Sequence, residues 1–137
     1  MAERAIDIFR GSVRVTVVRP SIIVSSYKEP FVGWTDTMAA GRTLILSIIN
    51  GYLTIVKFRR DSFLDIIPID FVVNTILAST AFTSLEPNPS LNIVHATSSH
   101  LNPITLGQII DCCNKFARKY PSINQFRSPG IKSVPNS

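Results

Sequence analysis

The stretch VRVTVVRPSIIV, Val13 to Val24, is the strongest indication of the fold in this sequence. It is rich in β-branched residues and apolar at nearly every position, which is typical of a parallel strand that is covered on both faces. Pro20 has no N–H to donate to a strand ladder, so we expect the regular strand to end near Arg19. The chain after Pro20 then leaves the carboxyl end of a central strand, which is where open α/β sheets bind their ligands.

Helical and extended patterns alternate along the rest of the chain. Helical spacing of apolar residues or helix-capping signals mark four segments, which are residues 2–10, 42–50, 70–82 and 105–120. Extended patterns mark residues 52–58 and 90–97. This alternation predicts an α/β protein with a parallel sheet and flanking helices.

Caps and glycines locate the ends of these helices. Gly11 and Gly51 are placed to end the first two helices. Asp70 is a good N-cap for the third, and Thr105 with Gln108 has the spacing of a capping box for the fourth. The third helix is apolar on almost every side, so we expect it to be buried.

The low charge content bounds the class of protein. Only 17% of the 137 residues are charged and 45% are hydrophobic, which fits a chain whose faces are covered by further polypeptide, or a domain with an apolar ligand site. The longest apolar stretches, Leu44–Val56 and Phe71–Phe82, fall short of the roughly 20 residues that span a bilayer. We therefore expect no transmembrane segment in this chain.

The net charge of +5 comes from one end of the chain. Every acidic residue lies before residue 113, whereas the last part carries only cations, namely Lys115, Arg118, Lys119, Arg127 and Lys132. A nucleic-acid site would spread cations and aromatic residues along a helix or sheet, so we expect a solvated tail and no nucleic-acid partner.

The cysteines and histidines exclude two kinds of site. Cys112 and Cys113 are adjacent, so they cannot staple a loop and indicate a reducing compartment. With His95 and His100 they have no recognised spacing of metal ligands, so no metal is expected.

Met1 is followed by a charged segment rather than a signal peptide, which also predicts an intracellular location.

The loop YKEPFVGWTD, Tyr27 to Asp36, follows the stretch Val13 to Val24 and combines aromatic rings, a proline, a glycine and charged groups. Four motifs then occur in a fixed order, which are VRPS, KEPFVGW, IPIDFVVN and NPITLG. In this order the chain resembles the alcohol-forming fatty acyl-CoA reductases, which are extended short-chain dehydrogenases. The resemblance covers residues 1 to about 130, and KEPFVGW is its most specific motif.

The resemblance implies a fold and an activity. Residues 1–120 would be the C-terminal part of a Rossmann-like NAD(P)-binding reductase domain, and residues 121–137 a basic, poorly ordered tail at the start of the family's C-terminal region. The whole reductase would use NADPH to reduce long-chain acyl-CoA to fatty alcohol. It would be membrane-associated, at the surface of the peroxisome or of the endoplasmic reticulum.

Two parts of the family's machinery do not occur in this sequence. The six glycines form no Gly-rich turn for the cofactor pyrophosphate, and the family's catalytic Tyr-x-x-x-Lys is missing. Each tyrosine is followed four positions later by Phe31, Val56 or Asn124 instead of lysine. MAERA resembles the stretch directly after that lysine, so we expect a fragment with no catalytic residue and no activity of its own.

The resemblance assigns the nicotinamide end of the cofactor to the residues directly after the predicted strand, which is expected to end near Arg19. These are Pro20, Ser21, Ile22 and Ile23. Backbone groups there would bond the carboxamide, and the alternative is plain packing between strand and loop.

The following loop is assigned to the substrate. Its candidate residues are Lys28, Glu29, Phe31, Gly33 and Trp34. The two rings would line an apolar slot for the acyl chain, and Lys28 would meet a phosphate or pair with Glu29. The alternative is a rigid structural loop packed on a neighbouring helix.

Two other functions stay open. One is an extended short-chain dehydrogenase of another substrate class, such as a sugar epimerase or a sterol dehydrogenase. The other is a non-catalytic interaction module that retains half of the sheet.

Overall fold

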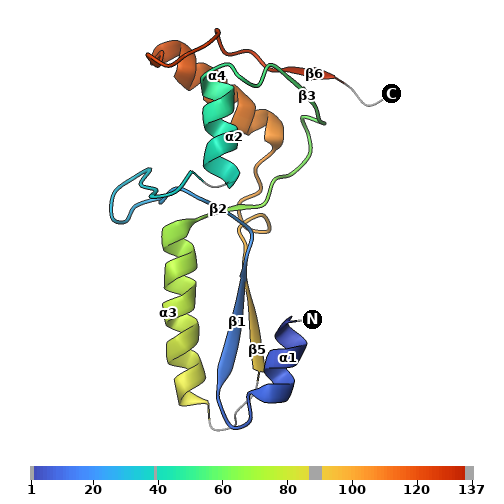
Figure 1. The fold of residues 1–137 in the computed structure, drawn as a ribbon, viewed down its shortest axis with the longest axis vertical. Coiled ribbons are helices and arrows are strands. Elements are labelled where there is room, and N and C mark those ends of the chain that lie inside the picture. Colours follow the sequence, from blue (N-terminus) through green and yellow to red (C-terminus); the bar gives the residue numbers. More distant parts are fainter. Residues whose placement is uncertain (1, 39, 87–90, 135–137) are drawn as a thin grey trace. The chain divides into compact units, whose positions relative to one another are not determined.

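The computed structural model describes residues 2–38, 40–86 and 91–134 (Figure 1). These residues form two compact units, and each unit is built from two separate stretches of chain. The first comprises Met1–Trp34 and Ile67–Thr97, and the second comprises Thr35–Ile66 and Ser98–Ser137. Both stretches of each unit lie mainly within the predicted reductase domain, whose boundary at residue 120 stays a prediction.

The first unit is built on a pair of parallel strands, as the sequence predicts. Strand β1 (Val15–Pro20) pairs with β5 (Leu91–Ala96) in register from Val15 opposite Leu91 to Pro20 opposite Ala96. Figure 1 shows the two strands side by side. The strand ends one residue later than expected, because Pro20 takes the last position and the next N–H, that of Ser21, donates to the Ala96 carbonyl at 3.0 Å.

The stretch Val13 to Val24 forms two strands instead of one. The chain bends at Ser21, and β2 (Ile22–Val24) then pairs with β4 (Ile66–Pro68) in a separate two-stranded sheet. Because Pro20 cannot donate to the ladder, the first strand ends at the bend and the second finds another partner.

Two helices accompany these strands. Helix α1 (Ala2–Phe9) is followed by Gly11 at a φ of 56°, a left-handed conformation that suits glycine at the end of a helix. Helix α3 (Ile69–Leu85) contacts β1 and β5. The small core of this unit consists of Ile67, Val72 and Ala96, with Val18 packed against it.

Two predictions about α3 are wrong. Its N-cap is Pro68, which provides no side-chain cap, and Asp70 lies inside the first turn. Its apolar surface is also largely uncovered in the described part of the chain, since Val72 and Thr83 are buried whereas Leu77 is 63% exposed. The reason is that β1 and β5 cover only one side of the helix.

The second unit packs two helices around its own core. Helix α2 (Ala40–Ile49) contacts α4 (Leu106–Lys119), and Ile48 packs with Ile110 and Cys113. The predicted capping box is confirmed, since the Gln108 N–H donates to Thr105 Oγ1 at 3.3 Å and the Thr105 N–H donates to Gln108 Oε1 at 2.8 Å.

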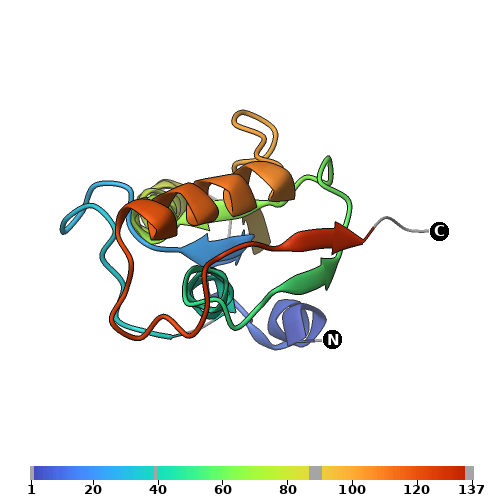
Figure 2. The same ribbon diagram turned by 90° about the horizontal axis from the view of Figure 1, so that it is seen from above.

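The C-terminal segment is more regular than predicted. Strand β6 (Lys132–Val134) pairs in parallel with β3 (Ile55–Lys57), and Figure 2 shows the two side by side. Before that strand, the Phe126 N–H donates to the Asn50 carbonyl at 2.9 Å, and the Phe126 ring stacks on Tyr52 with centroids 5.8 Å apart. These contacts attach the tail to the end of α2.

None of the helices in residues 2–38, 40–86 and 91–134 has the length and apolar character needed to cross a bilayer.

Candidate functional site

The first candidate site lies at the carboxyl end of β1. Pro20 ends the strand, Ser21 forms the bend, and Ile22 and Ile23 in β2 are each 41% exposed. Ser21 Oγ is buried and has no hydrogen-bond partner among the described residues. Because buried hydroxyls in folded proteins are nearly always paired, this group suits a bound polar ligand such as the carboxamide of a nicotinamide.

The loop after β2 is closed around Ser26, which is only 4% exposed. Its hydroxyl donates to the Phe31 carbonyl at 2.6 Å and accepts from the Trp34 N–H at 3.0 Å. Its backbone N–H donates to the Trp34 carbonyl at 3.0 Å, and its carbonyl accepts from the Gly33 N–H at 2.9 Å. Ser26 therefore fixes both ends of the segment that carries Phe31 and Trp34.

Asp70 holds the same loop from the first turn of α3. Its Oδ1 accepts from the Tyr27 N–H at 3.0 Å, and its Oδ2 accepts from the N–H groups of Lys28 at 2.9 Å and Glu29 at 3.3 Å. Three consecutive amides converging on one carboxylate form an anion-binding nest. The carboxylate that was predicted to cap its own helix binds the loop instead.

These hydrogen bonds change the acidity of Asp70. Desolvation raises the pKa of this carboxyl, but the N–H groups of Tyr27, Lys28 and Glu29 together outweigh that effect and hold the pKa below its usual value. The carboxylate is thus the favoured form whenever the loop is in place.

The next residue of the helix adds an aromatic contact to the same loop. The rings of Phe71 and Tyr27 meet edge to face, with centroids 6.0 Å apart and planes at 71°. The start of α3 therefore contacts the loop through one polar and one aromatic side chain.

The loop borders an open surface hollow of about 490 Å³. It is lined by Ser25, Ser26, Tyr27, Lys28, Val32 and Gly33. This is within the usual volume range of small-molecule sites, which are mainly apolar with a few polar groups.

The structure distributes the five predicted substrate residues over different positions. Lys28 and Gly33 line the hollow, and Gly33 adopts a φ of 82° that favours glycine. Glu29 reaches Asp70 through its backbone, Phe31 is 62% exposed, and Trp34 is half-buried; none of these three lines the hollow.

Sequence reasoning missed Ser26 and Asp70 as residues of this site. Ser26 had a usable signal, since it is a hydroxyl residue directly between a β-branched strand and an aromatic loop. Asp70 lies beside a helix start, which indicates a cap and gives no indication of a distant loop.

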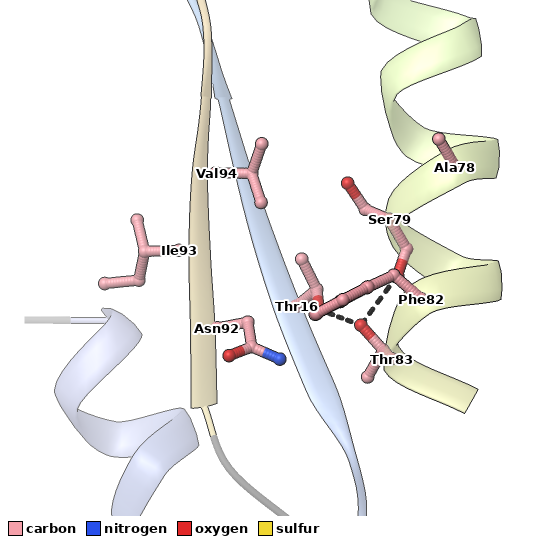
Figure 3. Close-up of a pocket in the computed structure, with 8 residues that line it drawn as sticks. All are labelled: Thr16, Ala78, Ser79, Phe82, Thr83, Asn92, Ile93 and Val94. Atoms are coloured by element: carbon pink, nitrogen blue, oxygen red, sulfur yellow. Dashed lines mark hydrogen bonds between the residues drawn. The ribbon is translucent and has the colours of Figure 1, made fainter. Parts of the chain in front are cut away.

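A second hollow lies at the other end of the β1–β5 pair and has a volume of about 300 Å³ (Figure 3). It is lined by Thr16, Ala78, Ser79, Phe82, Thr83, Asn92, Ile93 and Val94. The hydroxyls of Thr16 and Thr83 are hydrogen-bonded there, and Thr83 also donates to the Ser79 carbonyl at 2.7 Å. Thr16 lies near the amino end of its strand, away from the edge at which α/β sheets bind ligands. We therefore assign this hollow to packing.

Within the residues that the structure describes, no three His, Cys, Asp or Glu side chains are grouped so that they could hold a metal ion.

Comparison with known proteins gives a consistent family. The model of a family described as male sterility protein, an NAD-binding domain, matches residues 1–76. Fatty acyl-CoA reductase 1 of Rattus norvegicus is 29% identical over 137 residues, which is 100% of this chain and 27% of that protein. The chloroplastic fatty acyl-CoA reductase 2 of Arabidopsis thaliana is 31% identical over 132 residues, which is 94% of this chain and 21% of that protein.

This chain therefore spans about a quarter of the length of the curated relatives it matches. Among solved structures, UDP-glucose 4-epimerase from Thermotoga maritima superposes with a TM-score of 0.58 at 14% sequence identity. The superposition covers 98% of this chain and 38% of the epimerase chain. It supports the predicted Rossmann-like fold of an extended short-chain dehydrogenase.

Proposed function

Because this chain belongs to the male sterility family of NAD-binding domains, which includes the fatty acyl-CoA reductases, we propose that it serves the NADPH-dependent reduction of long-chain acyl-CoA to fatty alcohol. The structural observation that carries the proposal is the hollow of about 490 Å³ that is lined by the loop after β1 and β2. It lies after the carboxyl end of a parallel strand, where this class of fold binds ligands.

In this proposal the end of β1 meets the cofactor. Ser21, with its orphaned buried hydroxyl, and the backbone of Pro20, Ile22 and Ile23 contact the nicotinamide end. The cofactor, when bound, supplies hydride to the acyl carbonyl. The residues of this chain orient the ring, and they hold no general acid of the Tyr-x-x-x-Lys kind.

The loop contacts the acyl chain by shape. Val32 and Tyr27 provide apolar walls of the hollow, and Gly33 lets the backbone turn at its rim. Trp34, which is half-buried and follows Gly33 directly, does not line the hollow, and in this proposal a long acyl chain reaches beyond the hollow to its ring. Lys28, which is exposed, lies where a phosphate of the CoA group would be attracted.

Intrinsic fluorescence tests this assignment directly, since Trp34 is the only tryptophan in the chain. We expect the Trp34 emission to shift to shorter wavelength and saturate on titration with palmitoyl-CoA, because the ring loses water when an acyl chain covers it. Octanoyl-CoA should bind more weakly, and free CoA should leave the emission unchanged. Equal responses to all three compounds, or no response, would refute the assignment.

We further propose that this chain alone does not catalyse the reduction. General acid catalysis of the kind provided by Tyr-x-x-x-Lys contributes about 10²–10⁴-fold, and a Gly-rich turn provides the grip on the cofactor phosphates. Neither occurs in this sequence. Oxidation of NADPH that depends on palmitoyl-CoA, catalysed by the purified chain, would contradict this.

We propose that the protein is located inside the cell, at the surface of the peroxisome or of the endoplasmic reticulum membrane. The support is the adjacent cysteine pair and the family to which the chain belongs. Imaging of a tagged chain beside markers of both organelles tests this.

A further inference from the structure

The carboxylate of Asp70 does not cap the helix to which it belongs. The N-cap of α3 is Pro68, and no side chain caps the helix. Both oxygens of Asp70 are engaged by the loop, Oδ1 with Tyr27 and Oδ2 with Lys28 and Glu29. The Asp70 carboxylate therefore does not cap α3 and instead attaches the loop to the helix.

The three amides that bind Asp70 belong to the wall of the hollow. Tyr27 and Lys28 line it directly, and Glu29 continues the same backbone. Without the carboxylate, the three adjacent N–H groups would be hydrated separately, and no common acceptor would hold this stretch of backbone in one conformation. The shape of this wall therefore depends on Asp70.

Ser26 fixes the other side of the same hollow. It binds Phe31, Gly33 and Trp34, so it closes the loop on itself, whereas Asp70 attaches the loop to α3. Removal of Asp70 would leave the part of the loop that Ser26 closes, but would free the backbone of Tyr27 to Glu29 to move relative to Val32 and Gly33 on the opposite wall.

We propose that Asp70 is a positioning residue for the acyl-chain site: it sets the distance between the Tyr27–Glu29 wall and the rest of the hollow, and thereby sets which chain length fits. The inference rests on the function proposed above. It assigns Asp70 no contact with the substrate, since its carboxylate is already occupied by backbone groups.

The chain offers a matched control in Asp65. Its Oδ1 accepts from the N–H groups of Ser98 and Ser99, both at 3.2 Å, so it too binds consecutive amides of a loop. Asp65 and these serines belong to the second unit, whereas Asp70 and its loop belong to the first. Asp65→Asn therefore damages the same kind of contact in the unit that does not contain the hollow.

The test compares Asp70→Asn, Asp70→Glu and Asp65→Asn with the unchanged chain. The measurements are dissociation constants for palmitoyl-CoA and octanoyl-CoA from the Trp34 emission, and hydrogen exchange of the amides of Tyr27, Lys28 and Glu29. We expect Asp70→Asn to weaken palmitoyl-CoA binding about three- to tenfold and octanoyl-CoA binding less, with faster exchange of the three amides. Asp70→Glu keeps the charge and should recover part of the palmitoyl-CoA affinity.

Asp65→Asn should leave both dissociation constants unchanged. The inference is overturned if Asp70→Asn speeds amide exchange but leaves the ratio of the two dissociation constants as it was, or if Asp65→Asn changes that ratio equally. If the unchanged chain gives no acyl-CoA response, the proposed function itself fails, and the exchange data still report whether Asp70 holds the loop.

Discussion

Ser26 and Trp34 hold each other by two hydrogen bonds, from the Ser26 N–H to the Trp34 carbonyl and from the Trp34 N–H to Ser26 Oγ, each at 3.0 Å. A small buried hydroxyl thus determines where the largest side chain of the loop lies. The effect of Ser26 on the stability of the loop can be measured separately from the effect of Asp70, because the two side chains bind different parts of the loop.

Substitution Ser26→Ala should destabilise the loop more than its size suggests. It leaves the Phe31 carbonyl without its donor in a part-buried setting, and such losses cost about 1–3 kcal/mol. Chemical denaturation followed by the Trp34 emission measures the change. The neighbouring Ser25, which is exposed, provides the control: Ser25→Ala should lower the free energy of unfolding by less than about 0.5 kcal/mol.

Trp34 and Lys28 should differ in how they affect acyl-CoA binding. Covering an acyl chain with an indole contributes on the order of 1.5–3 kcal/mol, whereas a solvent-screened charge contributes about 0–1 kcal/mol. Calorimetry over acyl-CoAs of increasing length should show that Trp34→Ala loses most affinity on the longest chains. Lys28→Ala should lose little, and evenly. A Trp34→Ala variant with an unchanged length profile and a lower melting temperature would identify the loop as structural.

The amides bound to Asp70 should report its titration. The pKa of Asp70 is lowered in the folded state, so its carboxylate contributes stability that is present above the unfolded value of about 3.9. That contribution is lost as the pH falls through the lower folded pKa. The NMR shifts of the Tyr27, Lys28 and Glu29 amides should therefore share one midpoint below that of an ordinary aspartate. In Asp70→Asn they should stay flat, and a midpoint at or above the ordinary value would contradict the hydrogen-bond geometry.

Gly51 should tolerate no side chain. Its φ is 74°, and a Cβ atom there would collide with the carbonyl oxygen of Arg127. Gly51→Ala therefore combines a left-handed backbone, which costs about 1–2 kcal/mol, with a collision against the C-terminal segment. Gly11→Ala is the matched control, because Gly11 has a φ of 56° and open space around the added carbon. Thermal melts should rank Gly51→Ala clearly below Gly11→Ala, and equal melts would refute the collision.

The purified chain should associate with itself as its concentration rises. In the described part of the chain β1 pairs only with β5, and large apolar side chains such as Phe9, Leu77 and Leu85 are exposed. Light scattering should find an onset concentration, and the binding titrations belong below it. Leu77→Lys, on the uncovered surface of α3, should raise that onset. A monomer at all concentrations with a single sharp melt would contradict this.

The elements that the sequence predicts well are those whose signals are local. The capping box of Thr105 and Gln108 and the β-branched run in β1 each lie within a few residues of the structure they specify. The Asp70 interaction could not be predicted in this way, because its partners at Tyr27 to Glu29 are distant in sequence and an aspartate beside a helix start indicates a cap equally well.

The two remaining errors have different physical causes. The apolar pattern of α3 shows which side chains are able to be buried, but burial also needs a neighbour, and β1 and β5 reach only one side. Strand β6 was missed because it is three residues long and follows a segment rich in proline, serine and asparagine. Its pairing with β3 is visible only in three dimensions.

That pairing, together with the pairing of β1 and β5, constrains how the chain can reach its native state. Val15 must find Leu91, and Ile55 must find Lys132, so both ladders close loops of most of the chain. Such non-local contacts make folding slow, because the loop entropy is lost before the ladder forms. During synthesis β1 leaves the ribosome long before its partner β5, and β3 leaves it long before its partner β6. The nascent chain therefore carries an unpaired β1 edge until β5 has been made, and an unpaired β3 edge until β6 has been made, so we expect chaperones that bind extended apolar segments to recognise it.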